Sequence, residues 1–287
     1  MNKEHFSVTK LDKTFGATVR DVKLSKVTEG EVKELYSLWL RHSLLIFPDQ
    51  HLSTKEQIEF AKLFGVMEFD LAPISNVRSD GSIRDPVDDD VVKSLRGNME
   101  WHHDSTYMPI QAKGSVFTAH TVPADGGETG WADMTAAYKA LDPNMKDKVE
   151  GLRAYHSYVY SQAKYKHKPQ EESEFSGYGF DVDPHPFRPL VKTHPETGRK
   201  SLLIGRHAYG IPGMSKKDSK ALLDELNDFA CQGDRVYHHS WTPGDAVIWD
   251  NRNLMHQACP WDLNEARVMY HSRIQGDASS ESGLNYL

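Results

Sequence analysis

The second half of the chain is a succession of short apolar segments separated by glycine and proline turns, and this spacing constrains the fold more than any other feature. Segments rich in branched and aromatic residues, which are typical of strands, occupy 188–194, 200–207, 235–242, 245–251 and 266–275. Closely spaced strands of this kind are common in double-sheet jelly rolls. The sequence therefore predicts a mixed α/β chain with a double-stranded β-helix (jelly roll) core flanked by helices.

The flanking helices are expected mainly in the first half of the chain. Apolar residues recur at helical spacing in 28–43 and 53–65, and again in 134–151 and 215–232. No composition break or low-complexity stretch marks a linker between these segments. We therefore expect one domain that spans residues 1–287.

One stretch of the first half lacks a periodic pattern. Residues 70–98 include the polar run RSDGSIRDPVDDD, whose glycine, proline and aspartates are typical of turns. We expect this stretch to be an irregular, mobile lid.

Composition excludes several classes of partner. The 287 residues carry a net charge of −7, which argues against nucleic acid, because phosphate binding requires clustered lysine and arginine. The N-terminal segment lacks the apolar core of a signal peptide, and no run approaches the roughly 18 apolar residues of a membrane span. Cys231 and Cys259 have no disulfide or zinc-site spacing. These features predict a cytoplasmic protein with reduced thiols and no membrane association.

The tetrapeptide Trp101-His102-His103-Asp104 is the strongest chemical signal. In an extended segment, residues two apart point to the same side, so His102 and Asp104 could reach one metal ion while His103 points away. Two imidazoles and one carboxylate on one face leave open positions and suit Fe(II). The third ligand must come from a distant part of the chain, and His256, which follows a strand-like apolar run, is the best candidate.

Alternatives to this metal site exist. A bare His-x-Asp pattern arises often by chance, and ordinary packing or surface residues would give the same letters. Two other groups contain residues that can bind metals. His238 and His239 are adjacent in a strand, so they face opposite sides and cannot readily bind one ion together. The run from Asp181 to His185 lies in an irregular polar stretch that we interpret as a loop. The chain lacks the H-E-x-x-H motif of zinc proteases, the G-x-S-x-G motif of serine hydrolases, and a P-loop.

Several motifs together resemble the Fe(II)/2-oxoglutarate-dependent dioxygenases of the TauD/TfdA family. The residues that carry the resemblance are His102-x-Asp104, Thr129, Trp249, His256 and Arg267. It extends over nearly the whole chain, from LLIFPDQHLS to RVMYHSR. Within the family, the blocks GNMEWHHDSTYMP, RPLVKTHPETGRKSLLIGRHA and WDNRNLMHQACPWD are most similar to aryloxyalkanoate dioxygenases, especially those acting on (S)-2-phenoxypropionates.

The resemblance implies a set of cofactors and the residues that hold them. His102, Asp104 and His256 would bind Fe(II), with 2-oxoglutarate and O2 as co-substrates and ascorbate as a stimulant. The resemblance places Arg267 and Thr129 at the far carboxylate of 2-oxoglutarate, and a guanidinium suits a carboxylate because the two form paired hydrogen bonds. Trp249 matches an aromatic position beside the co-substrate, although core packing explains it equally well.

The substrate implied by the resemblance is a small aromatic carboxylate. Many relatives carry an arginine four residues after the co-substrate arginine, but this chain has His271 there. Arg273, on the same strand face, could replace it, or could form a structural ion pair. Asn98 and His207 match further positions near the substrate, with structural hydrogen bonding as the alternative.

The resemblance thus implies a dioxygenase that hydroxylates the ether-bearing carbon of (S)-2-phenoxypropionate or a phenoxyacetate herbicide. The products would be a phenol, a 2-oxo acid, succinate and CO2. Two alternatives remain open: the same chemistry on a sulfonate, sulfate ester or other small carboxylate, and a non-catalytic jelly roll that binds small acids. Relatives commonly form homo-oligomers, so a homo-oligomer is expected.

Overall fold

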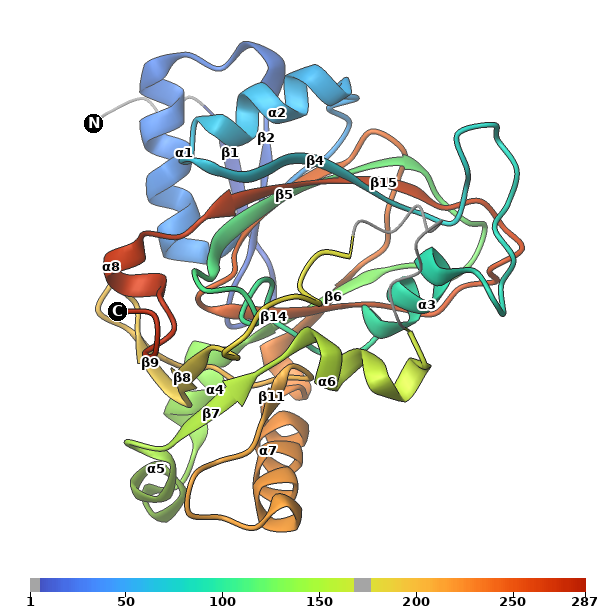
Figure 1. Ribbon diagram of the computed structural model, residues 1–287. Helices are drawn as coiled ribbons and strands as arrows, with labels where there is room; N and C mark the ends of the chain where they lie inside the picture. The colour runs from blue at the N-terminus through green and yellow to red at the C-terminus, as the bar shows by residue number, and fades with distance from the viewer. Residues whose placement is uncertain (1–5, 168–176) are drawn as a thin grey trace.

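The computed structural model describes residues 6–167 and 177–287 as a mixed α/β chain (Figure 1). The α-helices are α1 (Glu29–His42), α2 (Thr54–Lys62), α3 (Asp90–Gly97), α4 (Met134–Ala140), α5 (Pro143–Val149), α6 (Tyr158–Gln162), α7 (Lys216–Ala230) and α8 (Ala278–Glu281). The strands are β1 (Ser7–Lys10), β2 (Ala17–Arg20), β3 (Leu44–Phe47), β4 (Met67–Ser75), β5 (Ala112–Thr121), β6 (Thr129–Asp133), β7 (Arg153–His156), β8 (Phe187–Pro189), β9 (Val191–Thr193), β10 (Lys200–Leu202), β11 (Ala208–Tyr209), β12 (Val236–His239), β13 (Ala246–Asp250), β14 (Leu254–Ala258) and β15 (Val268–Gln275).

Two sheets form the centre of the molecule. The larger has the strand order β1-β2-β3-β13-β5-β15-β4, and the smaller has the order β12-β6-β14. All of their pairings are antiparallel except that of β2 with β3. Helices α1 and α2 lie over the larger sheet, whereas α4 and α7 lie beyond the smaller one (Figure 1). The chain is therefore layered as helices, sheet, sheet and helices.

Alternation along the strands assigns each side chain to a layer. In β13, Ile248 packs outward with the α1 and α2 cluster, whereas Trp249 packs inward between the two sheets. In β14, Met255 packs outward with α4 and α7, whereas Leu254 packs inward. Successive side chains of a strand point to opposite faces, so the inward set includes every second residue of each strand. This rule places His256 on the same inward side as Leu254.

Helices α1 and α2 begin where the sequence provides capping residues. Thr28 caps α1 through a reciprocal pairing with Glu31, and Ser53 caps α2 in the same way with Glu56. The apolar face of α1 buries Leu35 and Trp39 against the larger sheet. The amphipathic helices predicted over 28–43 and 53–65 are confirmed.

The stretch 70–98, expected to be irregular, contains two regular elements. Strand β4 pairs with β15 at the edge of the larger sheet, and α3 is capped by Asp89. The strand was missed because most of its residues are half-buried on both faces, which removes the alternating pattern. Its Pro73, which has no N–H to donate, is tolerated because β4 is an edge strand.

The segment 134–151 is two helices rather than one. Helix α4 ends at Ala140 and α5 begins at Pro143, with Asp142 as its cap. Proline at the first position of a helix is favourable, but it cannot continue a preceding one. In the ranges 6–167 and 177–287, no helix is long and apolar enough to cross a membrane.

Candidate metal centre

A cavity of about 550 Å³ opens beside the inward faces of the two sheets and is bordered by α3 and β4. The lining includes every residue that the sequence nominated for the site: Asn98, His102, Asp104, Thr129, His207, Trp249, His256, Arg267, His271 and Arg273. These residues come from segments more than 170 positions apart in the chain. The fold therefore brings all of them to one place.

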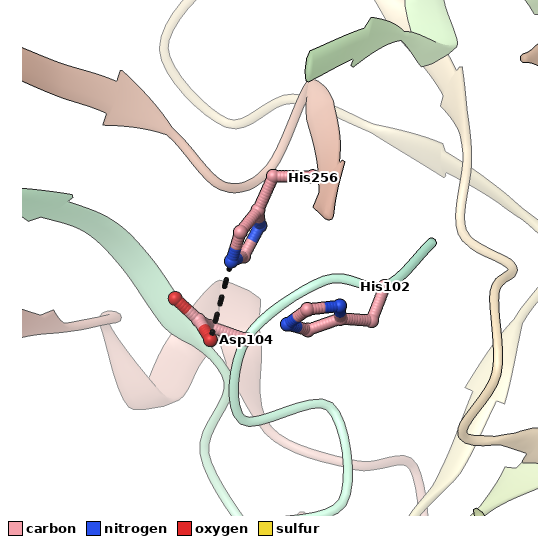
Figure 2. Close-up of side chains that lie close together, drawn as sticks. All are labelled: His102, Asp104 and His256. Carbon is pink, nitrogen blue, oxygen red and sulfur yellow. Dashed lines mark ion pairs between the residues drawn. The ribbon is translucent and has the colours of Figure 1, made fainter. Parts of the chain in front are cut away.

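His102, Asp104 and His256 line this cavity, and Figure 2 shows that their side chains point toward one another. One ligand atom of each residue lies within 4.8 Å of those of the other two, and all three side chains are buried. The Nε2 atom of His256 lies 3.8 Å from Oδ1 of Asp104. Within the described part of the chain, this is the only group of three such residues close enough to hold one metal ion.

Backbone pairing brings the two histidines together. The N–H of His102 donates to the carbonyl of His256 at 3.0 Å, and the N–H of His256 donates back at 2.8 Å. This pair is an isolated bridge, because residues 101–111 form no regular strand. The extended strand assumed for His102 and Asp104 is therefore wrong, although both side chains do reach the same site.

Electrostatics keep the three groups in the forms that bind a metal. Burial, followed by the nearby His256, holds the pKa of His102 well below its usual range, so its imidazole is neutral near pH 7. The Nδ1 atom of His102 faces the carbonyl of Glu100 at 2.7 Å, which makes Nδ1 the donor and leaves the lone pair of Nε2 for the site. Burial alone would raise the pKa of Asp104, but Arg273 and the imidazoles outweigh it and hold that pKa below its usual range. Two neutral imidazoles and a carboxylate are a donor set for a divalent metal.

His103 points away from this group. It is fully buried, and its Nδ1 lies 2.7 Å from the carbonyl of Asn251. Burial lowers the pKa of His103 to about 4, so it is neutral and serves as a hydrogen-bond donor to the backbone.

Arg267 is a buried cation that lacks an acidic partner among the described residues. Its Nε donates to the carbonyl of Gly127 at 3.1 Å, and its guanidinium lies 5.0 Å from the ring centre of Trp261. Its Nη2 atom has no hydrogen-bond partner within the described ranges. Burial lowers the pKa of Arg267 to about 10, which still leaves it charged at neutral pH. A buried charge without a partner is costly, so this guanidinium is suited to an anion entering the cavity.

Thr129 and Trp249 lie on the inward faces of β6 and β13. The Thr129 hydroxyl oxygen accepts a hydrogen bond from Nε1 of Trp241 at 3.0 Å, which leaves its own proton available to donate. The centre of the Trp249 ring lies 4.8 Å from the ring centre of His256 and 5.9 Å from that of Trp131. Trp249 therefore packs in the core and lines the cavity at once, as both interpretations of it require.

Comparison with known proteins is consistent with this geometry. The family described as "Taurine catabolism dioxygenase TauD, TfdA family" matches residues 7–273. The chain belongs to this family. It is therefore an enzyme of the dioxygenase class, and its arrangement of strands and helices matches solved structures of the family.

Individual relatives resemble nearly the whole chain. It is 57% identical to the (S)-phenoxypropionate/alpha-ketoglutarate-dioxygenase of Sphingobium herbicidovorans, over 97% of this chain and 98% of the relative. It is 35% identical to the alpha-ketoglutarate-dependent 2,4-dichlorophenoxyacetate dioxygenase of Cupriavidus pinatubonensis, over 92% and 96%. The crystal structure of AAD-2 in complex with Mn(II) and N-oxalylglycine has a TM-score of 0.87 and 34% identity, covering 97% of this chain and 99% of that one.

Arg273 and His271 lie on the inward face of β15, beside Asp104. Arg273 donates from Nη2 to Oδ1 of Asp104 at 2.8 Å and from Nη1 to the Ser105 hydroxyl at 3.1 Å. The ring of His271 stacks on Trp249 with centres 5.5 Å apart. Burial lowers the pKa of His271 to about 3, so it is neutral. The sequence-based placement of 271 and 273 on one face is matched by the structure, and Arg273 forms an ion pair with Asp104.

Asn98 and His207 complete the predicted set. The Nδ1 atom of His207 lies 2.9 Å from the Ser161 hydroxyl, and its ring meets that of His102 edge-to-face at 5.8 Å. Asn98 follows α3 directly, and its carbonyl accepts a hydrogen bond from the N–H of Ala258. Both line the cavity, but neither touches the three converging residues by hydrogen bond.

Sequence reasoning missed an acidic group next to Arg273. Glu68 lines the cavity, accepts hydrogen bonds from the Ser105 hydroxyl, and lies close to the hydroxyl of Tyr178. Burial raises the pKa of Glu68 to about 7 against the opposing charge of Arg273. No motif could have indicated this, because Glu68 lies in the strand that has no alternating pattern.

Proposed function

We propose that this chain is an Fe(II)- and 2-oxoglutarate-dependent dioxygenase that hydroxylates the ether-bearing carbon of aryloxyalkanoates. The proposed substrates are (S)-2-phenoxypropionate and phenoxyacetate herbicides. One oxygen atom of O2 enters the substrate, whose product collapses to a phenol and a 2-oxo acid, and the other enters succinate as CO2 leaves. The observation that carries the proposal is a carboxylate and two imidazoles that line one cavity together with Arg267, a buried cation without an ion pair in the described residues, in a chain 57% identical to its phenoxypropionate relative.

His102, Asp104 and His256 would hold the iron. Their donor set suits Fe(II), and three ligands on one side leave positions for 2-oxoglutarate and oxygen. Fe(II), when bound, supplies the oxygen chemistry, while the chain positions the reacting groups and excludes water. Arg267 and Thr129 would bind the far carboxylate of 2-oxoglutarate, with Trp249 beside it.

Asn98, His207, His271 and Arg273 would face the substrate. Phe69, Tyr107 and Phe117 add aromatic surface to the cavity, which suits the ring of a phenoxy acid. Arg273 shares its charge with Asp104, so it offers a substrate carboxylate less attraction than a free guanidinium would.

The same proposal covers the architecture. We take residues 1–287 as one domain with a jelly-roll core made by the two sheets, and residues 70–98 as a lid over the cavity. The layering of the sheets and the lining contributed by β4 and α3 support this interpretation. A cytoplasmic homo-oligomer without nucleic-acid or membrane partners completes it.

One assay tests the function. Purified protein is given Fe(II), ascorbate, 2-oxoglutarate and a panel of acids, and succinate and phenol are measured over time. Phenol release from one enantiomer of 2-phenoxypropionate, in step with succinate, is the expected result. Succinate formed only with a sulfonate, a sulfate ester or another carboxylate would favour that substrate class. No succinate with any acid, in protein shown to hold iron, would leave a non-catalytic acid-binding protein.

A further inference from the structure

The segment 250–256 runs from the last residue of β13 into β14, and it contains or contacts each of the three proposed metal ligands. It contains His256 itself, and the backbone of His256 pairs with that of His102. Asp104, the remaining ligand, is joined to the same segment through Asn251. One short segment therefore holds the backbones of the three residues relative to one another.

The side chain of Asn251 forms two complementary hydrogen bonds with the backbone of Asp104. Its Oδ1 accepts the Asp104 N–H at 2.8 Å, and its Nδ2 donates to the Asp104 carbonyl at 2.9 Å. Nδ2 also donates to the Ala112 carbonyl at 2.8 Å. A side-chain amide offers one acceptor and two donors, so it can take the place of a neighbouring strand at a residue that has none.

The backbone of Asn251 extends this contact to the next residue. Its carbonyl lies 2.7 Å from Nδ1 of His103, and its N–H donates to the carbonyl of Lys113 at 3.0 Å. Asn251 is fully buried, and every one of its polar atoms has a partner. It therefore holds two consecutive residues, His103 and Asp104, of the segment 103–109, which we call the ligand loop.

The ligand loop needs such an external support. Residues 103–109 form no strand, and Ser105, immediately after Asp104, has a φ of 55°, which is unfavourable for a residue with a side chain. A chain that bends at this point has no ladder of its own to direct the carboxylate of Asp104. The Asn251 amide provides the missing hydrogen bonds.

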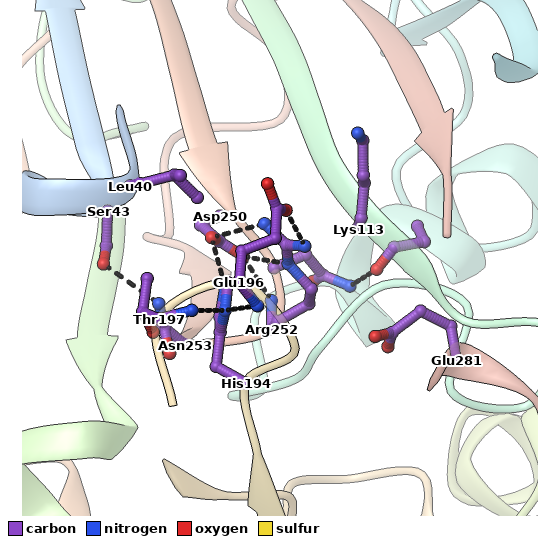
Figure 3. Close-up of polar contacts among 12 residues, drawn as sticks. Leu40, Ser43, Lys113, His194, Glu196, Thr197, Asp250, Arg252, Asn253 and Glu281 are labelled. Carbon is purple, nitrogen blue, oxygen red and sulfur yellow. Dashed lines mark hydrogen bonds and ion pairs between the residues drawn. The ribbon is translucent and has the colours of Figure 1, made fainter. Parts of the chain in front are cut away.

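Asp250 and Arg252, the residues before and after Asn251, are held by ion pairs and hydrogen bonds. Figure 3 shows their contacts with His194 and Glu196. Arg252 binds both carboxylate oxygens of Asp250, at 2.8 and 2.9 Å, and a third nitrogen binds Glu196 at 2.6 Å. Nε2 of His194 lies 2.9 Å from Asp250, while its Nδ1 accepts two backbone N–H groups at 3.1 Å, so Nε2 carries the proton. This network lies outside the cavity, and nothing in the proposed chemistry uses it.

A buried ion network is weak evidence for stability, because desolvation offsets the attraction between its charges. Removing one member would nevertheless leave an unpaired buried charge, so the network strongly prefers one arrangement. That arrangement fixes the turn on which Asn251 sits.

We propose that Asn251 is a positioning residue that aims the Asp104 carboxylate at the metal, and that the Asp250–Arg252–His194 network holds Asn251 in place. Asn251 acts through the backbone of Asp104 and does not touch the metal. The inference rests on the metal site of the proposed function. Groups that orient metal ligands commonly change metal affinity by about 10- to 100-fold when they are altered.

The test compares Asn251→Asp and Asn251→Ala with the matched control Asn253→Asp. Asn253 is two residues away and also buried, but its amide faces Thr135 and Ser43 rather than the ligand loop. Asn251→Asp keeps the shape and one acceptor but sets a carboxylate oxygen against the Asp104 and Ala112 carbonyls, whereas Asn251→Ala removes all three hydrogen bonds without adding a buried charge. Each full-length protein is stripped of metal and titrated with Mn(II), and free Mn(II) is measured by electron paramagnetic resonance. Visible absorption of the Co(II)-loaded proteins reports ligand geometry, and urea unfolding of the metal-free proteins reports stability.

The expected result is a Kd for Mn(II) raised about 10- to 100-fold in both Asn251 variants, with a changed Co(II) spectrum, while Asn253→Asp, which adds the same charge nearby, stays close to the wild type. A Kd and a spectrum unchanged in both Asn251 variants would overturn the inference. An equal loss in Asn253→Asp, in line with its loss of stability, would also overturn it, because the effect would then be general. If the wild type and His256→Ala bound Mn(II) equally weakly, the proposed metal site itself would fail and the inference with it.

Discussion

Two buried arginines lie six residues apart on one segment, yet they meet the cavity in different states. Arg267 lacks an acidic partner in the described ranges and leaves Nη2 unbonded, whereas Arg273 forms an ion pair with Asp104 at 2.8 Å. Glu68 adds a second acid beside Arg273. Charge type alone therefore does not assign a role. The cation without an ion pair is available to an incoming carboxylate, and the paired one orients a group already present.

The largest expected effect comes from breaking the pair at its acidic end. Asp104→Asn removes a proposed metal ligand and the partner of Arg273 together, so succinate formation and Mn(II) binding should both be lost. Coupled turnover and the Mn(II) titration measure this. Retained activity in this variant would contradict the role of Asp104 as a ligand.

Removing the unpaired cation should come next. Arg267→Leu deletes the charged donor for the far carboxylate of 2-oxoglutarate, and the KM for 2-oxoglutarate should rise about 100-fold, which corresponds to about 3 kcal/mol. The Kd for Mn(II) measured without 2-oxoglutarate should stay close to that of the wild type. A variant that binds 2-oxoglutarate normally would show that the co-substrate lies elsewhere.

Removing the paired cation should give the reverse pattern. In Arg273→Leu the Asp104 carboxylate loses the ion pair that orients it, so the Kd for Mn(II) should rise about tenfold. The KM for 2-oxoglutarate should remain near the wild-type value, with Arg267→Leu as the reciprocal control. If the KM for 2-oxoglutarate rose equally in Arg267→Leu and Arg273→Leu, the distinction between the two arginines would be wrong.

The remaining expected effect concerns stability rather than binding, and it depends on Glu68. Burial raises its pKa to about 7 in the folded chain, above the value of an exposed glutamate, so the folded state binds the proton more tightly. The free energy of unfolding should therefore fall as pH rises through this interval, by at most about 3 kcal/mol. Glu68→Gln should remove this contribution, making the variant relatively more stable at about pH 8 than at about pH 5. Urea unfolding measures this free energy. If the difference between the two proteins were the same at both pH values, the expectation would be contradicted.

Much of the fold followed from local signals. Helices α1 and α2 were predicted from the spacing of their apolar residues, because this pattern is local. Strand β4 was not predicted, because its burial depends on a partner 200 residues away. The prediction of a jelly roll rested on strand spacing alone. The order in which strands pair could not be predicted, because it is set by contacts that no local pattern encodes.

The residue types available to the site can be read from the amino-acid order: the His102-x-Asp104 pattern, a distant His256, and cations at 267 and 273. Strand alternation also determined that 267, 271 and 273 share one side. The tertiary structure alone decided that Arg273 meets Asp104, that Glu68 lies beside them, and that Asn251 holds the backbone of the ligand loop. The physical reason is that hydrogen bonds and ion pairs depend on distance and burial, and these are fixed only when segments far apart in the chain pack together.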